Sequence, residues 1–323
     1  MMTSKFSRRS ALGQAGLLVG AALAGPNLCA AVASENPKVR SDDKPFRFCL
    51  NTATIRGQKL GIVKEIEIAA RAGYDAVEPW VDGIEDYVKK GGKLTELRDK
   101  ISDSGLTVEG AIGFPEWVVN DEVKRAKGMD RARHEMELVA QIGGKRFAAP
   151  PVGATDLPKL EIVQAAERYR RLLEAGDQIG IVPELELWGF SKNLNRLGEC
   201  IWVAMETNHP KACVLADVFH LYKGGSGFDG FRLLGPNAVQ VLHMNDFPAT
   251  PPPEQIDDSY RIYPGDGTAP FPEILRGLHN TGGQKVLSLE LFSRKYWEQD
   301  PLEVAKTGLA KMKAVAEKAV GAI

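Results

Sequence analysis

Short apolar runs alternate with longer amphipathic segments from Phe46 to the C-terminal end of this 323-residue chain. Each short run is rich in Val, Leu, Ile or Ala and gives way to turn or loop residues, which is the pattern of a buried strand. Eight such runs occur, at 46–53, 75–80, 106–112, 146–151, 181–188, 212–217, 238–245 and 285–292. We therefore predict eight strands that share one buried core.

Amphipathic helices are predicted between these strands, because apolar residues recur there at helical spacing. The predicted helices span 62–72, 121–142, 159–179, 193–206, 271–279 and 301–320. Glycine follows several of the helix ends, as at Gly73 and Gly180, which is typical of a helix C-terminal cap. Eight β/α units around one core predict an α/β protein with a single (β/α)8 TIM barrel. A doubly wound sheet is the alternative, but it usually needs fewer strands per domain.

The first 33 residues have the pattern of a twin-arginine export signal. Arg8 and Arg9 precede a mild apolar run at 11–24, and the AVA sequence at 31–33 matches a small-residue cleavage site. The run is too short and glycine-rich to span a membrane, which takes about 20 apolar residues. We expect export to the periplasm, with no stable membrane insertion after cleavage. An unstructured N-terminus with a chance pair of arginines is the alternative.

A polar linker at 34–45 and a barrel domain at 46–323 follow the predicted signal. Charged residues make up 26% of the chain and hydrophobic residues 44%, as in ordinary globular proteins. The formal net charge of −1 provides no basic surface for nucleic acid, so we expect no such partner. The four cysteines lack C-x-x-C spacing, and neither a zinc ribbon nor a redox pair is indicated.

Polar side chains end the last four predicted strands, at the rim where barrel enzymes carry their active sites. These residues are Glu186, Asp217, His243 and Glu290. Three carboxylates that converge in a buried rim repel one another, and a bound divalent cation removes most of that cost. Oxygen and imidazole ligands suit Mn²⁺ or Mg²⁺, with Co²⁺ and Zn²⁺ as alternatives. The sequence therefore predicts one metal site, with Asp246 placed to orient His243 from behind.

Glu184 lies two residues before Glu186 and therefore faces the same side of its strand. We assign the metal to Glu186, which is nearer the C-terminal end of the strand. Glu184 is expected one layer deeper, paired with a buried Lys or Arg. The alternative for the whole cluster is a structural ion-pair network with Arg261 or Lys223.

The segment GSGFDG at 225–230 satisfies the G-x-G-x-x-G spacing of a dinucleotide site. Such a site needs its first glycine at the end of a strand and a full helix directly afterwards. Here the segment LYKG (221–224) intervenes, and Gly235-Pro236 cuts the following helix short. We therefore predict a flexible loop beside the site.

The motifs at the strand ends resemble those of the xylose isomerase-like TIM-barrel superfamily, which contains sugar phosphate isomerases and epimerases. The resemblance rests on GIVPELE (180–186), LADVFH (215–220), LHMND (242–246), RIYPGDG (261–267) and LSLE (287–290). It extends over nearly all of 46–320 and implies that the four residues at the strand ends hold the metal. It also implies that His220 and Arg261 contact the substrate. Trp188 is a further candidate for binding a sugar face.

The resemblance implies a metal-dependent isomerase or epimerase that acts on a keto sugar or related polyol through an enediolate. Glu186 and Glu290 would move the protons. A lyase or dehydratase acting on an oxidised sugar or glycoside is one alternative, and a periplasmic sugar-binding barrel without catalysis is another. The long loop at 247–260 and the LWGF sequence at 187–190 depart from the family, which leaves the sugar open. Superfamily members often form dimers or tetramers, which leaves a homo-oligomer open.

Overall fold

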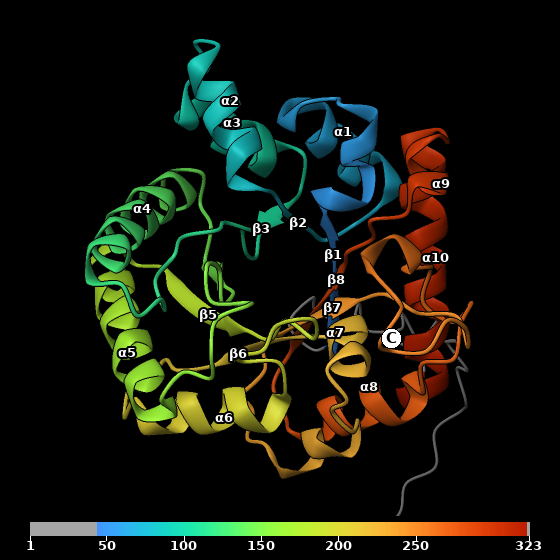
Figure 1. Ribbon diagram of the computed structural model, residues 1–323. Helices are drawn as coiled ribbons and strands as arrows, with labels where there is room; N and C mark the ends of the chain where they lie inside the picture. The colour runs from blue at the N-terminus through green and yellow to red at the C-terminus, as the bar shows by residue number, and fades with distance from the viewer. Residues whose placement is uncertain (1–43, 322–323) are drawn as a thin grey trace, which may run out of the picture. The chain divides into compact units, whose positions relative to one another are not determined.

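Eight parallel strands form the centre of the computed structural model, which describes residues 44–321 of the chain (Figure 1). Neighbouring strands follow the order β3-β2-β1-β8-β7-β6-β5-β4. The backbone N–H of Ala148 in β4 donates to the carbonyl of Ala111, just after β3, at 3.0 Å and joins the two ends of the sheet. The predicted (β/α)8 barrel is thereby confirmed.

Every predicted strand is present, and each lies inside the range expected from its apolar run. The strands are β1 (Phe46–Asn51), β2 (Ala76–Glu78), β3 (Thr107–Val108), β4 (Arg146–Ala149), β5 (Val182–Glu186), β6 (Val214–Asp217), β7 (Val241–Met244) and β8 (Lys285–Leu289). The apolar side chains inside the barrel include the small Cys49, Ala76 and Ala148 beside larger Val, Ile and Leu side chains. The carboxyl ends of the strands meet at one rim, and the polar residues that end them are brought together there.

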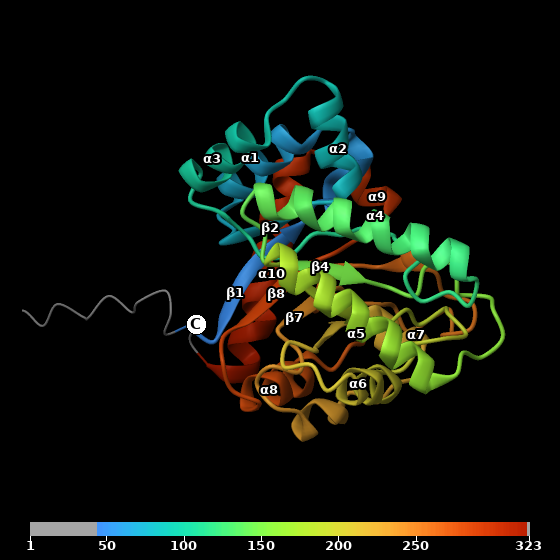
Figure 2. The same ribbon diagram turned by 90° about the vertical axis from the view of Figure 1, so that its left-hand side faces the viewer.

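Helices cover the outside of the barrel, as the view from the side shows (Figure 2), and a larger apolar core lies between helices and strands. The helices are α1 (Ile62–Ala72), α2 (Val81–Lys89), α3 (Leu94–Asp103), α4 (Glu122–Gln141), α5 (Ile162–Ile179), α6 (Leu197–Glu206), α7 (Val218–Lys223), α8 (Phe271–Asn280), α9 (Arg294–Trp297) and α10 (Pro301–Val320). The short 3-10 helices of residues 44–321 are η2 (Thr52–Gln58), η3 (Asp229–Leu233) and η4 (Asp258–Tyr260).

The structure confirms all six predicted helices and adds α2, α3, α7 and α9. Helix α6 starts at Leu197 instead of Asn193, because the Asn193 side chain is used elsewhere. Its amide donates to the carbonyl of Ala154 at 2.8 Å and its oxygen accepts from the N–H of Leu160 at 2.8 Å. Asn193 thus ties two loops together before the helix begins.

The predicted export signal at 1–33 and most of the predicted linker lie outside the described residues. Among residues 44–321, no helix has both the length and the apolar character needed to cross a membrane.

Candidate metal centre and substrate pocket

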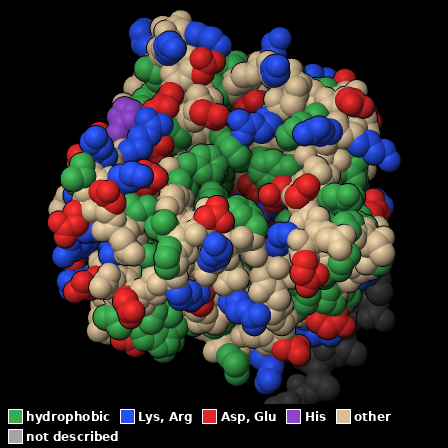
Figure 3. Space-filling model, in the orientation of Figure 1, with side chains coloured by type: hydrophobic (Ala, Val, Ile, Leu, Met, Phe, Trp, Pro, Cys, Tyr) green, Lys and Arg blue, Asp and Glu red, His purple; other side chains and the backbone are tan. Residues whose placement is uncertain are grey.

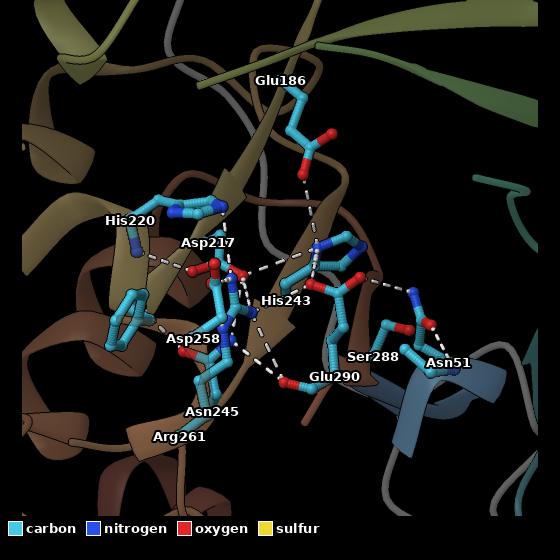
Figure 4. A network of polar contacts seen from close by, with 12 residues as sticks. Asn51, Glu186, Asp217, His220, His243, Asn245, Asp258, Arg261, Ser288 and Glu290 are labelled. Atoms are coloured by element: carbon cyan, nitrogen blue, oxygen red, sulfur yellow. Dashed lines mark hydrogen bonds and ion pairs between the residues drawn. The ribbon is translucent and has the colours of Figure 1, made fainter. Parts of the chain in front are cut away.

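The structure brings the predicted metal ligands together at the carboxyl ends of β5 to β8 (Figure 4). One ligand atom from each of Asp217, His243 and Glu290 lies within 4.8 Å of the other two. Glu186 faces the same point from β5, with its Oε1 3.9 Å from Nδ1 of His243. All four side chains are buried, and neither Asp217 nor His243 has any exposed surface.

The His243 ring has the orientation that a metal-binding imidazole needs. Its Nε2 lies 3.0 Å from Oε2 of Glu78. Its Nδ1 lies 3.1 Å from Glu290 Oε2 and 3.7 Å from Asp217 Oδ2, yet it makes no hydrogen bond with any described residue. Buried nitrogens rarely lack a hydrogen bond. A ring nitrogen that faces carboxylates without a hydrogen bond to them is the arrangement expected where a cation binds between them.

Glu78, at the end of β2, is the carboxylate that positions His243. It also accepts hydrogen bonds from Asn51 Nδ2 at 2.9 Å and from Ser288 Oγ at 2.7 Å. Burial opposes ionisation of Glu78, but His243 and these donors outweigh it and hold the pKa of Glu78 below its usual value. A charged, fixed carboxylate behind the ring is the usual support of a metal-bound histidine.

The role predicted for Asp246 is therefore wrong. Its two carboxylate oxygens accept four backbone hydrogen bonds, all at 2.8 to 2.9 Å, from the N–H groups of Phe247, Gly265, Gly267 and Ala269. A side chain at Gly267 would collide with Asp246 and with the carbonyl of Phe247, whose oxygen would lie only 2.2 Å from the added Cβ atom. Asp246 thus shapes the loop that follows Arg261. One carboxylate can accept hydrogen bonds from four backbone N–H groups only where the chain turns tightly around it.

Arg261 reaches the predicted metal ligands directly. Its Nη1 donates to Asp217 Oδ2 at 2.7 Å and to Glu290 Oε2 at 2.9 Å. Its Nη2 donates to Asp258 Oδ1 at 2.7 Å and lies 3.2 Å from His220 Nε2. The ion-pair network considered as an alternative is thus present for Arg261, which is 1% exposed.

Lys223, the other cation considered for that network, lies away from the cluster. Its Nζ donates to the backbone carbonyls of Pro253 at 3.0 Å and Ile256 at 2.6 Å. It therefore holds part of the long loop at 247–260 and does not neutralise a carboxylate of the rim.

The electrostatics of the cluster favour additional positive charge. Burial raises the pKa of Glu186 well above its usual value, and the nearby Glu290, Asp217 and Glu78 add to that rise. Burial opposes protonation of His243, but Glu290 and Glu78 outweigh it and raise the pKa of His243 well above its usual value. Glu186 thus resists ionisation, while His243 attracts a proton. Both shifts indicate that the cluster contains more negative charge than the protein neutralises.

Helix α7 brings His220 to the rim. Asp217 caps the helix, because its Oδ1 accepts the backbone N–H of His220 at 2.7 Å. The His220 ring is 3% exposed, and within the described part of the chain its Nδ1 has no hydrogen-bond partner. A buried polar ring atom without a partner is uncommon in a folded protein and marks His220 as a candidate functional residue.

A pocket of about 200 Å³ opens above the cluster. It is lined by Trp80, Ile112, Phe114, Glu186, Trp188, Phe190, His220, Asp258, Arg261, Glu290 and Phe292. Figure 3 shows acidic side chains inside a hollow on this face, with hydrophobic side chains next to them. The residues predicted to bind substrate, His220, Arg261 and Trp188, all lie in its wall. The glycine-rich segment 225–230 instead lines a different pocket, together with residues of α6.

Sequence reasoning did not identify Phe114 and Phe190 as pocket residues. Both follow a predicted strand within a few positions, Phe114 in IGFP at 112–115 and Phe190 in LWGF at 187–190. Their position shortly after a strand was the one signal that could have identified them. Because apolar residues are common at such positions, that signal did not distinguish Phe114 and Phe190 from core residues.

Comparison with known proteins places the chain among sugar-processing relatives. The family described as Xylose isomerase-like TIM barrel matches residues 66–315. An inosose isomerase of Bacillus velezensis is 22% identical over 277 residues, covering 84% of this chain and 98% of that protein. A 3-dehydro-D-guloside 4-epimerase of Escherichia coli is 22% identical over 233 residues, covering 67% of this chain and 83% of that protein.

Solved structures share the barrel. A crystal structure of IolI protein with a bound zinc atom has a TM-score of 0.77 and 20% identity, and it covers 84% of this chain and 98% of that chain. A D-psicose 3-epimerase crystallised with D-fructose has a TM-score of 0.68 and 18% identity, with 84% and 99% covered. At these identities the likeness shows the fold.

Proposed function

The chain belongs to the xylose isomerase-like TIM barrel family, and from this we propose that it is a divalent-metal-dependent isomerase or epimerase of a keto sugar or related polyol. The observation that carries the proposal is Nδ1 of His243, buried and without a hydrogen bond, facing three carboxylates at the floor of a pocket. The activities of the relatives, inosose isomerase and sugar epimerases, support the same reaction class.

Glu186, Asp217, His243 and Glu290 would hold the metal, with Mn²⁺ or Mg²⁺ as the first choice and Co²⁺ or Zn²⁺ as alternatives. The zinc in the related solved structure supports a divalent ion of some kind. When bound, such an ion would polarise the substrate carbonyl and lower the barrier to proton removal by several kcal/mol.

The side chains of the pocket supply the proton transfers. Glu186 and Glu290 approach His243 from different sides (Figure 4), so one can take a proton from a substrate carbon while the other returns one. Burial, with the nearby carboxylates, raises the pKa of Glu186 well above its usual value, which favours the proton-bearing form of this carboxyl. Positioned acids and bases of this kind typically contribute about 10²–10⁴-fold to the rate.

Arg261 and His220 would bind the substrate's oxygens. The Arg261 guanidinium donates in a fixed direction because Asp258 holds its Nη2 and Nε, at 2.7 and 2.9 Å. The His220 ring lies in the wall of the same pocket, and its Nδ1 has no hydrogen bond with a described residue. Trp188 would cover the apolar face of a sugar ring.

A lyase or dehydratase that acts on an oxidised sugar or glycoside is the second candidate. Removal of the same proton can be followed by loss of a neighbouring leaving group, and a protonated Glu186 could donate to that group. We also propose that the mature protein acts in the periplasm, on the pattern of the first 33 residues.

Elemental analysis of the purified protein, followed by assays on a panel of keto sugars, tests the proposal. The protein is stripped with a chelator, reloaded separately with Mn²⁺, Mg²⁺, Co²⁺ or Zn²⁺, and incubated with each sugar while NMR and mass spectrometry follow the products. New sugar signals at unchanged mass, present only with metal, are expected. Loss of water or of an aglycone would assign the lyase, and tight binding without turnover in a metal-replete sample would assign a binding protein.

A further inference from the structure

Aromatic rings form a continuous row along one side of the substrate pocket. Consecutive ring centroids lie 5.9 Å apart for Phe292 and Trp80, 5.0 Å for Trp80 and Phe114, 6.2 Å for Phe114 and Trp188, and 5.1 Å for Trp188 and Phe190. These residues follow β8, β2, β3 and β5, so the row is assembled by the barrel rim and not by one loop. All five rings line the pocket.

The inner part of the row is fixed to the metal centre. The indole N–H of Trp80 donates to Asn51 Oδ1 at 3.0 Å, and the amide of Asn51 in turn donates to Glu78 and Glu290. Arg56 covers the Trp80 ring from 4.0 Å. Trp80 therefore has a set orientation next to the groups that would carry out the chemistry.

The outer part of the row is exposed. Phe114 is 41% exposed and Phe190 is 46% exposed, and they are the two strongly exposed phenylalanines among residues 44–321. The remaining phenylalanines of that range lie in the core or are half-buried. Core packing therefore does not account for these two rings, and large apolar side chains that border a pocket mark a surface meant for contact.

The size of the pocket indicates how much of a substrate can lie beside the inner part of the row. A volume of about 200 Å³ is small beside the roughly 300–1,000 Å³ of typical ligand sites. The polar lining residues Glu186, His220, Arg261 and Glu290 are buried, whereas Phe114 and Phe190 are exposed, so the polar groups lie at the inner end of the pocket. A single sugar ring would fill this inner space, and a group attached to the sugar would then lie at the mouth, beside the exposed Phe114 and Phe190.

We propose that Phe114 and Phe190, on either side of Trp188 in the row, form a second subsite, which binds the flat apolar face of an aglycone attached to the reacting sugar. The preferred substrates are thus glycosides of a keto sugar, and free keto sugars are poorer substrates. This inference rests on the proposed function, since it assigns the substrate class of the same pocket. An aromatic platform suits such a group because ring faces stack through area burial and preferred offset or edge contacts.

Matched glycosides test the subsite with the metal-reloaded, full-length protein. The methyl and phenyl β-glycosides of one 3-keto sugar are compared by NMR-monitored kinetics. We expect kcat/KM to be at least about tenfold higher for the phenyl glycoside, mainly through a lower KM. Phe114→Ala and Phe190→Ala should each bring this phenyl-to-methyl ratio close to one, and Phe190→Tyr should restore it. Leu233→Ala, which removes an exposed apolar side chain that lines a different pocket, should leave the ratio unchanged.

Binding of the unoxidised methyl and phenyl β-glucosides, measured by saturation-transfer NMR, gives a readout that needs no turnover. Turnover of the 3-keto glycosides with a phenyl-to-methyl ratio of one overturns the subsite and leaves the isomerase or epimerase standing. Failure of both glycosides to react, while phenyl glucoside binds in a Phe190-dependent way, instead removes the proposed function. A dimer in light-scattering chromatography that dissociates on Phe114→Ala or Phe190→Ala would show that these rings contact a second copy, and would overturn the subsite.

Discussion

Two clusters of buried carboxyl groups lie in this one barrel, and they differ in how their charge is balanced. The deeper cluster consists of Glu109, just after β3, and Glu184 in β5. Lys145 and Arg146 contact Glu109 at 2.7 and 3.2 Å, and Arg47 approaches it at 3.6 Å. Arg146 also lies 3.5 Å from Glu184, as expected for the inner carboxyl of β5. The protein thus supplies three cations to two carboxyl groups.

The rim cluster has the opposite balance. Its carboxyl groups are Glu78, Glu186, Asp217 and Glu290. In the part of the chain that the structure describes, Arg261 is the one Lys or Arg in ion-pair contact with them, and it shares its charge with Asp258. His243 stands between these carboxylates, with one nitrogen unbonded.

This difference in charge balance assigns a structural role to the deeper cluster and a ligand-binding role to the rim cluster. Buried carboxylates are tolerated when the protein itself neutralises them, and such groups hold the fold together. An excess of buried negative charge costs stability unless a ligand removes it, and therefore marks a place where a cation is expected to bind. The barrel carries one cluster of each kind on its inward face.

Glu290→Gln has the largest expected effect, because it breaks the rim cluster at a residue that would serve both metal and proton transfer. We expect turnover to fall by about 10³-fold or more, measured by NMR on the best sugar of the panel. The melting temperature of the chelator-treated protein should change little, because the removal of an excess charge offsets the weaker contact with Arg261, which keeps its bonds to Asp217 and Asp258. Glu137→Gln, at an exposed position of α4, is the control. Full activity of Glu290→Gln would contradict the assignment.

The deeper cluster should respond to the same chemical change in the opposite way. Glu109→Gln leaves three cations around a neutral amide, and we expect it to lower the free energy of unfolding by about 2–3 kcal/mol. Glu186→Gln, in metal-free protein, should leave that energy unchanged or raise it, because burial and neighbouring carboxylates already favour its neutral form. Urea unfolding in the presence of a chelator measures both. Equal losses for the two variants would show that the clusters do not differ.

The sequence predicted the rim ligands because barrel topology places every strand end at one rim, and a polar residue ending an apolar run is visible locally. Asp217 and His243, for example, lie near the carboxyl ends of adjacent strands and opposite each other in the β6–β7 pairing. The inner position of Glu184 followed from the two-residue period of a strand in the same way.

Contacts across the barrel axis were not predictable from such patterns. Glu78 meets His243 although 165 positions separate them, and no local signal pairs the two. Asp246, three residues after His243, was assigned to that role by proximity along the chain, but its carboxylate turns to the backbone of 265–269. Helix α7 has six residues, too few for a periodic signal, so the placement of His220 and its cap by Asp217 also depended on the structure.

Glu78→Gln sharpens the comparison, since it weakens the support of the metal centre without removing a predicted ligand. The neutral amide can no longer hold the His243 ring by charge, and we expect metal affinity to fall about 10–100-fold. Isothermal titration of chelator-treated protein with Mn²⁺ or Zn²⁺ measures this change. Ser288→Ala removes one of the hydrogen bonds to Glu78 and should have a smaller effect of the same sign. Unchanged affinity in Glu78→Gln would mean that the ring is oriented by its packing alone.

Glu184→Gln has the smallest expected effect and tests how completely the deeper cluster is neutralised. Burial, only partly offset by Arg146, raises the pKa of Glu184 from its usual 4.5 to about 8. The folded protein therefore holds this proton more tightly than the unfolded chain, so its stabilising contribution is complete below pH 4.5 and is lost as the pH rises through about 8. The neutral Gln side chain has no such loss.

The difference in unfolding free energy between Glu184→Gln and the unmodified protein should consequently shift in favour of the variant by about 1 kcal/mol or more from pH 5 to pH 8. The groups of the rim are present in both proteins, so most of their contribution cancels in this difference. Urea unfolding with a chelator at several pH values measures it. Parallel stability curves would show that Arg146 keeps Glu184 charged throughout this range, and the deeper cluster would then be a fully ionised network.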